Sequence, residues 1–185
     1  VDFAIAARFS DDGGGTNSGT SFVFFGPITG DVTTSQADVL ISGGEEEAAG
    51  HALSGGNPVL GIGADTNNDG NNDFLVSAIW ADSKRGAVYL AQGPFSADID
   101  LSTSATARLV GEVANDQLGK GAVAFVSDVN GDGSDDYLIG THRNDNIATN
   151  NGAAYLVLGG TEASGPITDV AHVSLYGGLD DQLGY

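Results

Sequence analysis

Two short segments carry the side chains best suited to chemistry. Residues 65–73 and 128–136 both read D-x-N-x-D-G-x-x-D, with an offset of 63 residues between them. Side chains at positions 1, 3 and 5 of a tight loop converge on one point when a glycine at position 6 allows a sharp reversal. Ca²⁺ takes roughly six to eight oxygen ligands at about 2.3–2.6 Å, and such a loop can supply them. The pattern therefore predicts two calcium-binding loops.

Every predicted ligand is an oxygen atom, and hard oxygen ligands favour Ca²⁺ over metals that prefer nitrogen or sulfur. Position 7 would contribute its backbone carbonyl, and position 9 would close the site with a carboxylate. The predicted ligands are Asp65, Asn67, Asp69, Asn71 and Asp73 in the first loop, and Asp128, Asn130, Asp132, Ser134 and Asp136 in the second. We therefore expect Ca²⁺ as the cofactor, in two sites.

Two other interpretations of these loops compete with this one. Asn, Asp and Gly also favour turns that bind nothing, but such turns need no fixed spacing, so two copies of one spacing favour metal binding. An EF-hand loop places a glutamate at position 12 and continues into a helix. Position 12 is Val76 or Ile139 here, and the residues after position 9 are typical of a short buried strand.

Internal repeats of about 66 residues organise the chain. Two templates recur at this spacing, one at residues 19–27, 86–94 and 152–160, and the other at residues 2–7, 73–78 and 136–141. Each repeat holds short runs of Val, Ile, Leu, Phe and Tyr bounded by Gly, Asn, Asp and Pro, which predicts strands joined by turns. No segment has a clear helical period, and the Ser/Thr/Ala-rich residues 96–107 are predicted to form a loop.

The repeats predict an all-β fold of β-propeller blades, each with four antiparallel strands. We expect about three blades in a single array over residues 1–185. The approximate blade boundaries are 1–43, 44–111 and 112–177, with the start of a further blade at 178–185. Because propellers close with roughly four to eight blades, we expect an incomplete propeller: either a fragment of a longer chain, or a unit completed by oligomerisation.

The chain is strongly acidic, with 25 Asp and Glu against 6 Lys and Arg and a net charge of −19. This charge repels nucleic acid and anionic membrane surfaces. A salt-adapted or highly soluble surface and bound cations both explain it, and the spacing of the carboxylates favours bound cations. The most apolar run, residues 75–81, is too short to cross a bilayer. We therefore expect neither nucleic acid as a partner nor insertion into a membrane.

The loops and strands resemble the FG-GAP repeats of integrin α-subunit propellers and their bacterial relatives. Leu118-Gly119 and Leu183-Gly184 stand where the family has Phe-Gly, and residues 152–158 resemble its Gly-Ala-x-Tyr strand. The family's Gly-Ala-Pro element is replaced at residues 77–79 and 140–142. The resemblance covers nearly the whole chain and implies an extracellular, calcium-binding propeller.

In this family the calcium loops lie on one face of the propeller and the opposite face commonly binds ligands. Carried over to this chain, the resemblance implies that the opposite face includes the turns after the second template. The candidate ligand-binding residues there are Arg8, Phe9, Trp80, His142 and Arg143. Trp and Arg suit binding hot spots. Packing of the aromatic side chains under neighbouring loops, with solvated arginines, is the alternative.

No residue is predicted to be catalytic. The chain has no cysteine, and His51, His142 and His172 stand in no zinc-binding pattern. We therefore expect a module, not an enzyme, that mediates adhesion or binds a protein or glycan ligand. The alternative is a structural assembly unit of a cell-surface fibre or large adhesin, whose partners are copies of itself.

Overall fold

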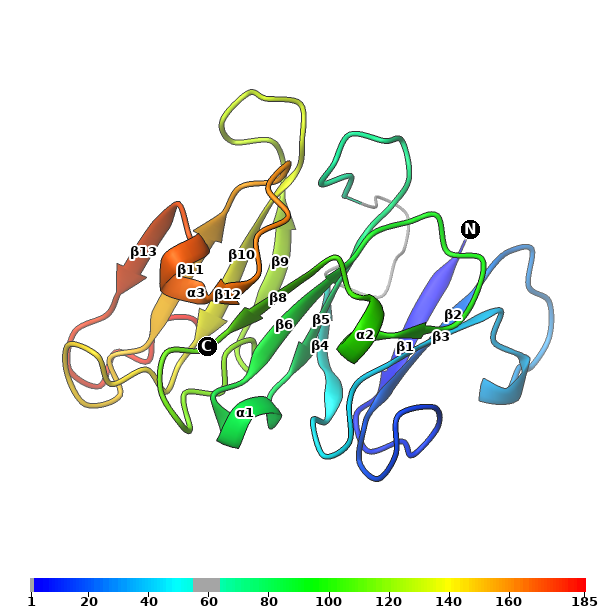
Figure 1. The fold of residues 1–185 in the computed structure, drawn as a ribbon, viewed down its shortest axis with the longest axis horizontal. Helices are drawn as coiled ribbons and strands as arrows, with labels where there is room; N and C mark the ends of the chain where they lie inside the picture. Colours follow the sequence, from blue (N-terminus) through cyan, green and yellow to red (C-terminus); the bar gives the residue numbers. More distant parts are fainter. Residues whose placement is uncertain (1, 55–63) are drawn as a thin grey trace.

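The computed structural model describes residues 2–54 and 64–185, which form three β-sheets with short helical turns between strands (Figure 1). The first sheet has the order β1 (Phe3–Ala7), β2 (Thr20–Phe24), β3 (Val39–Ser42) and β7 (Ile99–Asp100). The second has the order β12 (Gly165–Pro166), β8 (Ala107–Val110), β6 (Ala87–Ala91), β5 (Phe74–Ala78) and β4 (Ala49–Ser54). The third has the order β13 (Val173–Tyr176), β11 (Ala153–Val157), β10 (Asp136–Thr141) and β9 (Val123–Val126). The all-β class predicted from the sequence is confirmed.

One very short strand links each pair of consecutive sheets: β7 links the first and second sheets, and β12 links the second and third. The long strands pair antiparallel, whereas β7 pairs parallel with β3 and β12 pairs parallel with β8. Both short strands lie in the segment that links the last two antiparallel strands of the next sheet. The same connection therefore recurs one repeat later, as the sequence periodicity implies.

Among residues 2–54 and 64–185, helical structure is limited to short turns. These are the 3₁₀ turn η1 (Thr34–Gln36) and the four-residue turns α1 (Ala81–Lys84), α2 (Leu101–Ser104) and α3 (Ile167–Val170). The segment predicted as a loop at 96–107 contains β7 and α2, because burial of Leu101 and an Asp100 cap on the Ser102 N–H fix one turn there. One turn is too short to give the sequence a helical period. Within the described residues, no helix is long and apolar enough to cross a membrane.

The hydrophobic core lies between the sheets, in two clusters. One joins the first and second sheets and includes Ile41, Val76 and Tyr89. The other joins the second and third sheets and includes Leu75 and Tyr155. Because alternate side chains of a strand point to opposite faces, neighbours on β5 enter different clusters, and every residue of β5 and β6 is buried. The second sheet is therefore covered on both faces.

A glycine directly precedes β2, β6 and β11, the equivalent strands of the three sheets, and closely approaches the backbone of the segment that leads into the next repeat. Gly19, Gly86 and Gly152 have φ values of +76°, +79° and +69°. A Cβ atom would lie 2.1 Å from the Ala49 oxygen, 2.3 Å from the Leu118 nitrogen and 2.2 Å from the Leu183 oxygen, respectively. The backbone N–H groups of these three partners donate to the carbonyls of Ser18, Arg85 and Asn151. The sequence repeat is thus also a repeat of contacts between segments.

Candidate functional site

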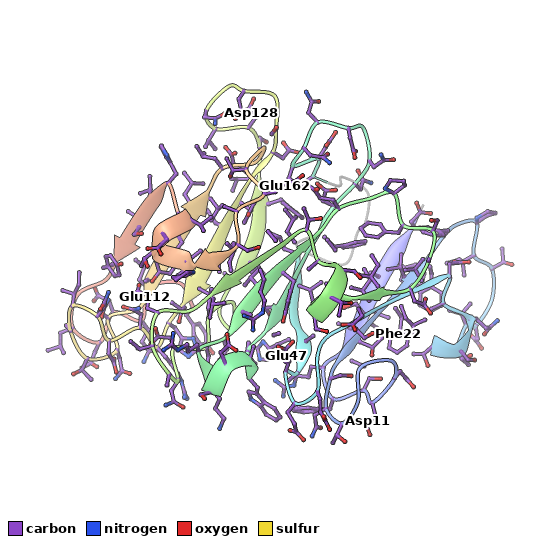
Figure 2. The ribbon with its side chains drawn as sticks, in the orientation of Figure 1. Asp11, Phe22, Glu47, Glu112, Asp128 and Glu162 are labelled. Atoms are coloured by element: carbon purple, nitrogen blue, oxygen red, sulfur yellow. The ribbon has the colours of Figure 1, made fainter. Side chains whose placement is uncertain are left out.

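The two predicted calcium loops lie side by side at one end of the sheets. Residues 65–73 lead into β5 and residues 128–136 lead into β10, and Figure 1 shows the loops next to each other above the second and third sheets. Asp128 marks this end in Figure 2, with Glu47 and Glu112 at the opposite end. Equivalent positions in successive repeats therefore place both loops on the same edge of the fold.

The first loop is organised by its own carboxylates. Asp65 accepts hydrogen bonds from the N–H groups of Asp69 (2.9 Å) and Gly70 (2.7 Å), and Asp69 accepts from the N–H of Asn71 (2.8 Å). Gly70 has φ +84°, which permits the reversal at position 6. The backbone N–H of Asn71 is the main cause that lowers the pKa of Asp69. The loop therefore holds an exposed carboxylate in its charged form.

The second loop repeats this geometry. Asp128 accepts hydrogen bonds from the N–H groups of Asp132 (3.1 Å) and Gly133 (2.8 Å), and Asp132 accepts from the N–H of Ser134 (2.9 Å). Gly133 has φ +96° at the same position as Gly70 in the first loop. The Gly133 N–H is the main cause that lowers the pKa of Asp128. Two loops with one spacing thus have one hydrogen-bond pattern.

The carboxylates at position 9 anchor the loops to the neighbouring turn. Asp73 accepts from the Thr66 N–H (2.8 Å) and the Gly93 N–H (3.0 Å). Asp136 accepts from the Val129 N–H (2.8 Å) and the Gly159 N–H (2.8 Å). Both carboxylates are buried, and burial raises the pKa of Asp73. Their structural role is to fix the base of each loop, and their role as calcium ligands remains a prediction.

The chemistry of the donor set fits Ca²⁺. Positions 3 and 5 lie together, since the Asn67 amide contacts Asp69 at 3.0 Å and the Asn130 amide contacts Asp132 at 2.8 Å. These are hard oxygen donors on the exposed side of each loop. In residues 2–54 and 64–185, no three His, Cys, Asp or Glu side chains are already grouped to hold a metal. The carbonyls of Asn71 and Ser134 remain predicted ligands at position 7.

The two loops also contact each other. The Asp65 N–H donates to the Asp135 carboxylate at 3.1 Å, and the Asp135 N–H donates to the Asp65 carbonyl at 3.0 Å. These bonds join the first position of one loop to the penultimate position of the other. The two loops are therefore joined by reciprocal hydrogen bonds between Asp65 and Asp135.

The residues predicted for the ligand-binding face lie at the opposite end of the sheets, in two groups. The rings of Phe9 and Trp80 lie 5.4 Å apart, and the Arg8 guanidinium lies 4.5 Å from the centre of the Phe9 ring. His142 is 9% exposed, packs edge-on against Tyr185, and is followed by the exposed Arg143. The structure therefore brings Arg8, Phe9 and Trp80 together and places His142 beside a cavity instead.

This cavity, which we call the central cavity, has a volume of about 470 Å³ and is lined by His51, Lys120, Gly121, His142 and Tyr185. The sequence analysis did not identify His51 or Lys120 as candidate site residues. The repeat could have pointed to them, because His51, Lys120 and Tyr185 each directly follow a glycine at the equivalent repeat position, namely Gly50, Gly119 and Gly184. Equivalent positions in successive repeats converge here on one space.

A second cavity of about 370 Å³ adjoins the central cavity through His142 and Tyr185, which line both. Its other polar lining residues are Asn115, Asp116, Arg143, Asp145, Asn150 and Gln182. We call it the polar cavity. Asp116 is 2% exposed and accepts a hydrogen bond from the Val113 N–H (3.0 Å), yet its burial raises the pKa of Asp116 to about 6.

Asp116→Asn should stabilise the protein at pH 8 but not at pH 4. A carboxyl whose pKa is raised on folding stabilises the fold below about pH 4, and this contribution is lost as the pH rises through about 6. Asparagine stays neutral and can still accept from the Val113 N–H. Thermal unfolding followed by circular dichroism at both pH values tests this. Asp31→Asn, the same charge change at an exposed position far from this cavity in the sequence, is the control, and a lower midpoint for Asp116→Asn at pH 8 would contradict the prediction.

No model of a known protein family matches the chain, and no curated protein matches its sequence.

Proposed function

We propose that this chain is part of an extracellular β-propeller that binds two Ca²⁺ ions and uses the opposite end of its sheets for adhesion. The three sheets would be blades of the propeller, and the FG-GAP repeats remain the family they resemble. The observation that carries the proposal is the pair of D-x-N-x-D-G-x-x-D loops with the same hydrogen bonds on the same edge of the fold. The partner would be a protein or glycan, and catalysis forms no part of the proposal.

The physical role of calcium in this proposal is to relieve repulsion and to tie strands together. Each loop carries three aspartates within nine residues, Asp65, Asp69 and Asp73 in the first. Neutralising these charges favours the compact loop. Because the loops lie between consecutive strands, their order should propagate into the start of β5 and β10.

Calorimetric titration of calcium into chelator-treated protein should show two sites per chain, with little heat from magnesium. Magnesium demands a tighter octahedral shell and keeps its waters. Asp132→Ala should remove one site and leave the other. A folded protein that takes up no calcium would refute the calcium assignment, and two sites surviving in Asp132→Ala would refute the loop assignment.

A structural assembly unit is the second candidate, favoured by apolar side chains on the outer sheets. Ile5 on β1 is 57% exposed, and Leu175 on β13 is 51% exposed. Both strands lie at an edge of their sheets. Unpaired edges with apolar side chains suit pairing with further copies. Sedimentation over a range of concentrations separates the two candidates: assembly predicts association, which Ile5→Lys and Leu175→Lys should abolish.

A further inference from the structure

Basic side chains are rare in this chain, and half of them gather at one place. The chain has six Lys and Arg residues. Lys120 lines the central cavity with His51 and His142, Arg143 lines the adjoining polar cavity, and Arg8 lies near enough to His51 for its charge to lower the pKa of that imidazole. We call these five residues the basic cluster. The cluster draws on four sequence segments that are far apart, so only the fold brings it together.

The pKa values show that these groups are close enough to interact. Burial lowers the pKa of His51 first, and Arg8 and Lys120 lower it further. Burial likewise lowers the pKa of His142, with added contributions from Lys120 and Arg143. Burial, then Arg143 and Arg8, lower the pKa of Lys120. The cluster is therefore a set of mutually repelling groups.

In the part of the chain that the structure describes, no carboxylate forms an ion pair with these groups that would offset the repulsion. The ion pairs in the described part of the chain both involve Arg108, which contacts Glu47 and Asp82. Lys120 instead donates to the Gln117 amide oxygen at 2.7 Å. Carboxylates are abundant in a chain of net charge −19. Because none of the described carboxylates forms an ion pair with Arg8, Lys120 or Arg143, the basic cluster differs from an ordinary salt-bridge network.

The histidines add unused hydrogen-bonding capacity. The Nδ1 atoms of His51 and His142 are buried, and neither has a hydrogen-bond partner among the residues that the structure describes. Buried polar atoms are normally satisfied, and each exception calls for an explanation. An imidazole has one N–H when neutral and two when protonated, so both rings can donate to an anion in the central cavity.

We propose that the central cavity binds the carboxylate or sulfate group of an acidic glycan, held by Lys120, Arg143 and the two histidines. The charge of Arg8 acts on His51, and its guanidinium stacks on the exposed Phe9, which lies against the partly buried Trp80 and links the site to this aromatic pair. This inference rests on the proposed function, because it names the ligand of the end of the sheets that we assign to adhesion.

The polar cavity favours a sugar over an acidic peptide. It adjoins the central cavity and presents Asp145, Asn150 and Gln182. Sugar hydroxyl groups can donate to carboxylate and amide oxygens, whereas a chain of acidic side chains would be repelled by Asp145. At about 470 Å³ and 370 Å³, the two cavities are of a size that holds a small ligand.

Calorimetric titration of the calcium-loaded protein with hexasaccharides tests the proposal. The probes are oligogalacturonate, which carries only carboxylates; a heparin hexasaccharide, which also carries sulfates; and neutral cellohexaose. At least one acidic hexasaccharide should bind one per chain, cellohexaose should not, and the acidic ligand that binds more tightly identifies the anion. Hexaglutamate is the peptide control, and tighter binding of it than of both acidic sugars would overturn the choice of a glycan.

Matched variants distinguish specific binding at the basic cluster from a general attraction of acidic ligands to positive charge. Arg143→Gln and Lys120→Gln should each weaken binding about tenfold, as expected for the loss of one close charge contact. Arg85→Gln and Lys84→Gln make the same chemical changes at exposed positions outside the basic cluster and should leave the affinity unchanged. Equal losses in all four variants, or no binding of any acidic hexasaccharide, would overturn the proposal. Calcium stoichiometry measured on the same samples shows separately whether the proposed function has failed.

Discussion

Calcium should raise the free energy of unfolding of this protein substantially. A ligand that binds only the native state stabilises it by about 2.7 kcal/mol at 100 times its dissociation constant, and two independent sites would together give about twice that value. Each loop carries several carboxylates within nine residues, including Asp128 and Asp132, and bound calcium would neutralise their charge. Urea denaturation with and without calcium measures the difference.

Single and double variants assign this effect to the loops. Asp69→Ala and Asp132→Ala should each remove about half of the calcium-dependent gain, and the double variant should remove all of it. Without calcium, each should be slightly less stable than the parent chain, because the hydrogen bond that Asp69 accepts from the Asn71 N–H, or Asp132 from the Ser134 N–H, is lost. Asp31→Ala, an equal change in charge at an exposed position outside both loops, should retain the full gain. Equal unfolding midpoints with and without calcium in the parent chain would count against both sites.

Gly86→Ala should destabilise the fold by more than about 4 kcal/mol, which is in the severe range for single substitutions. The residue has φ +79°, and its new Cβ would lie 2.3 Å from the backbone nitrogen and 2.6 Å from the backbone oxygen of Leu118. Backbone atoms cannot rotate away as a side chain can. The Leu118 N–H also donates to the Arg85 carbonyl at 2.8 Å, so relief of the overlap would stretch this hydrogen bond between segments.

Gly30→Ala is the matched control for this prediction. Gly30 has the same φ of +79°, but nothing lies within 4 Å of a Cβ built there. Its substitution should cost only the left-handed backbone penalty of about 1–2 kcal/mol. Urea unfolding of the two variants separates backbone strain from close approach, and soluble yield reports on Gly86→Ala if it does not fold. Similar stabilities for Gly30→Ala and Gly86→Ala would show that the close approach between segments is unimportant.

Much of the fold could be predicted from the sequence because its signals are local. Runs such as residues 74–78 and 87–91 became strands, since β-branched and aromatic residues between turn formers favour extended backbone. The repeat of about 66 residues also reappears as repeated contacts of Gly19, Gly86 and Gly152. The α2 turn was missed because it depends on burial of Leu101 between sheets.

The form of the two acidic loops was determined by the sequence alone. The hydrogen bonds accepted by the carboxylates at positions 1 and 5 run between residues two to five positions apart, such as Asp65 to Gly70 and Asp128 to Gly133. Bonds of such short range need only the right residues at the right spacing, together with glycine at the reversal. The same local pattern therefore formed twice, in two different sheets.

Only the tertiary structure decided how the opposite end of the molecule is arranged. His51, Lys120 and His142 share one cavity although many residues separate them in the sequence. The sequence likewise did not show that Asp73 and Asp136 would be held by the backbone of Gly93 and Gly159. The physical reason is the same in both cases. Burial and charge environment depend on which sheets pack together, and sheet packing is set by contacts between distant segments that no local pattern records.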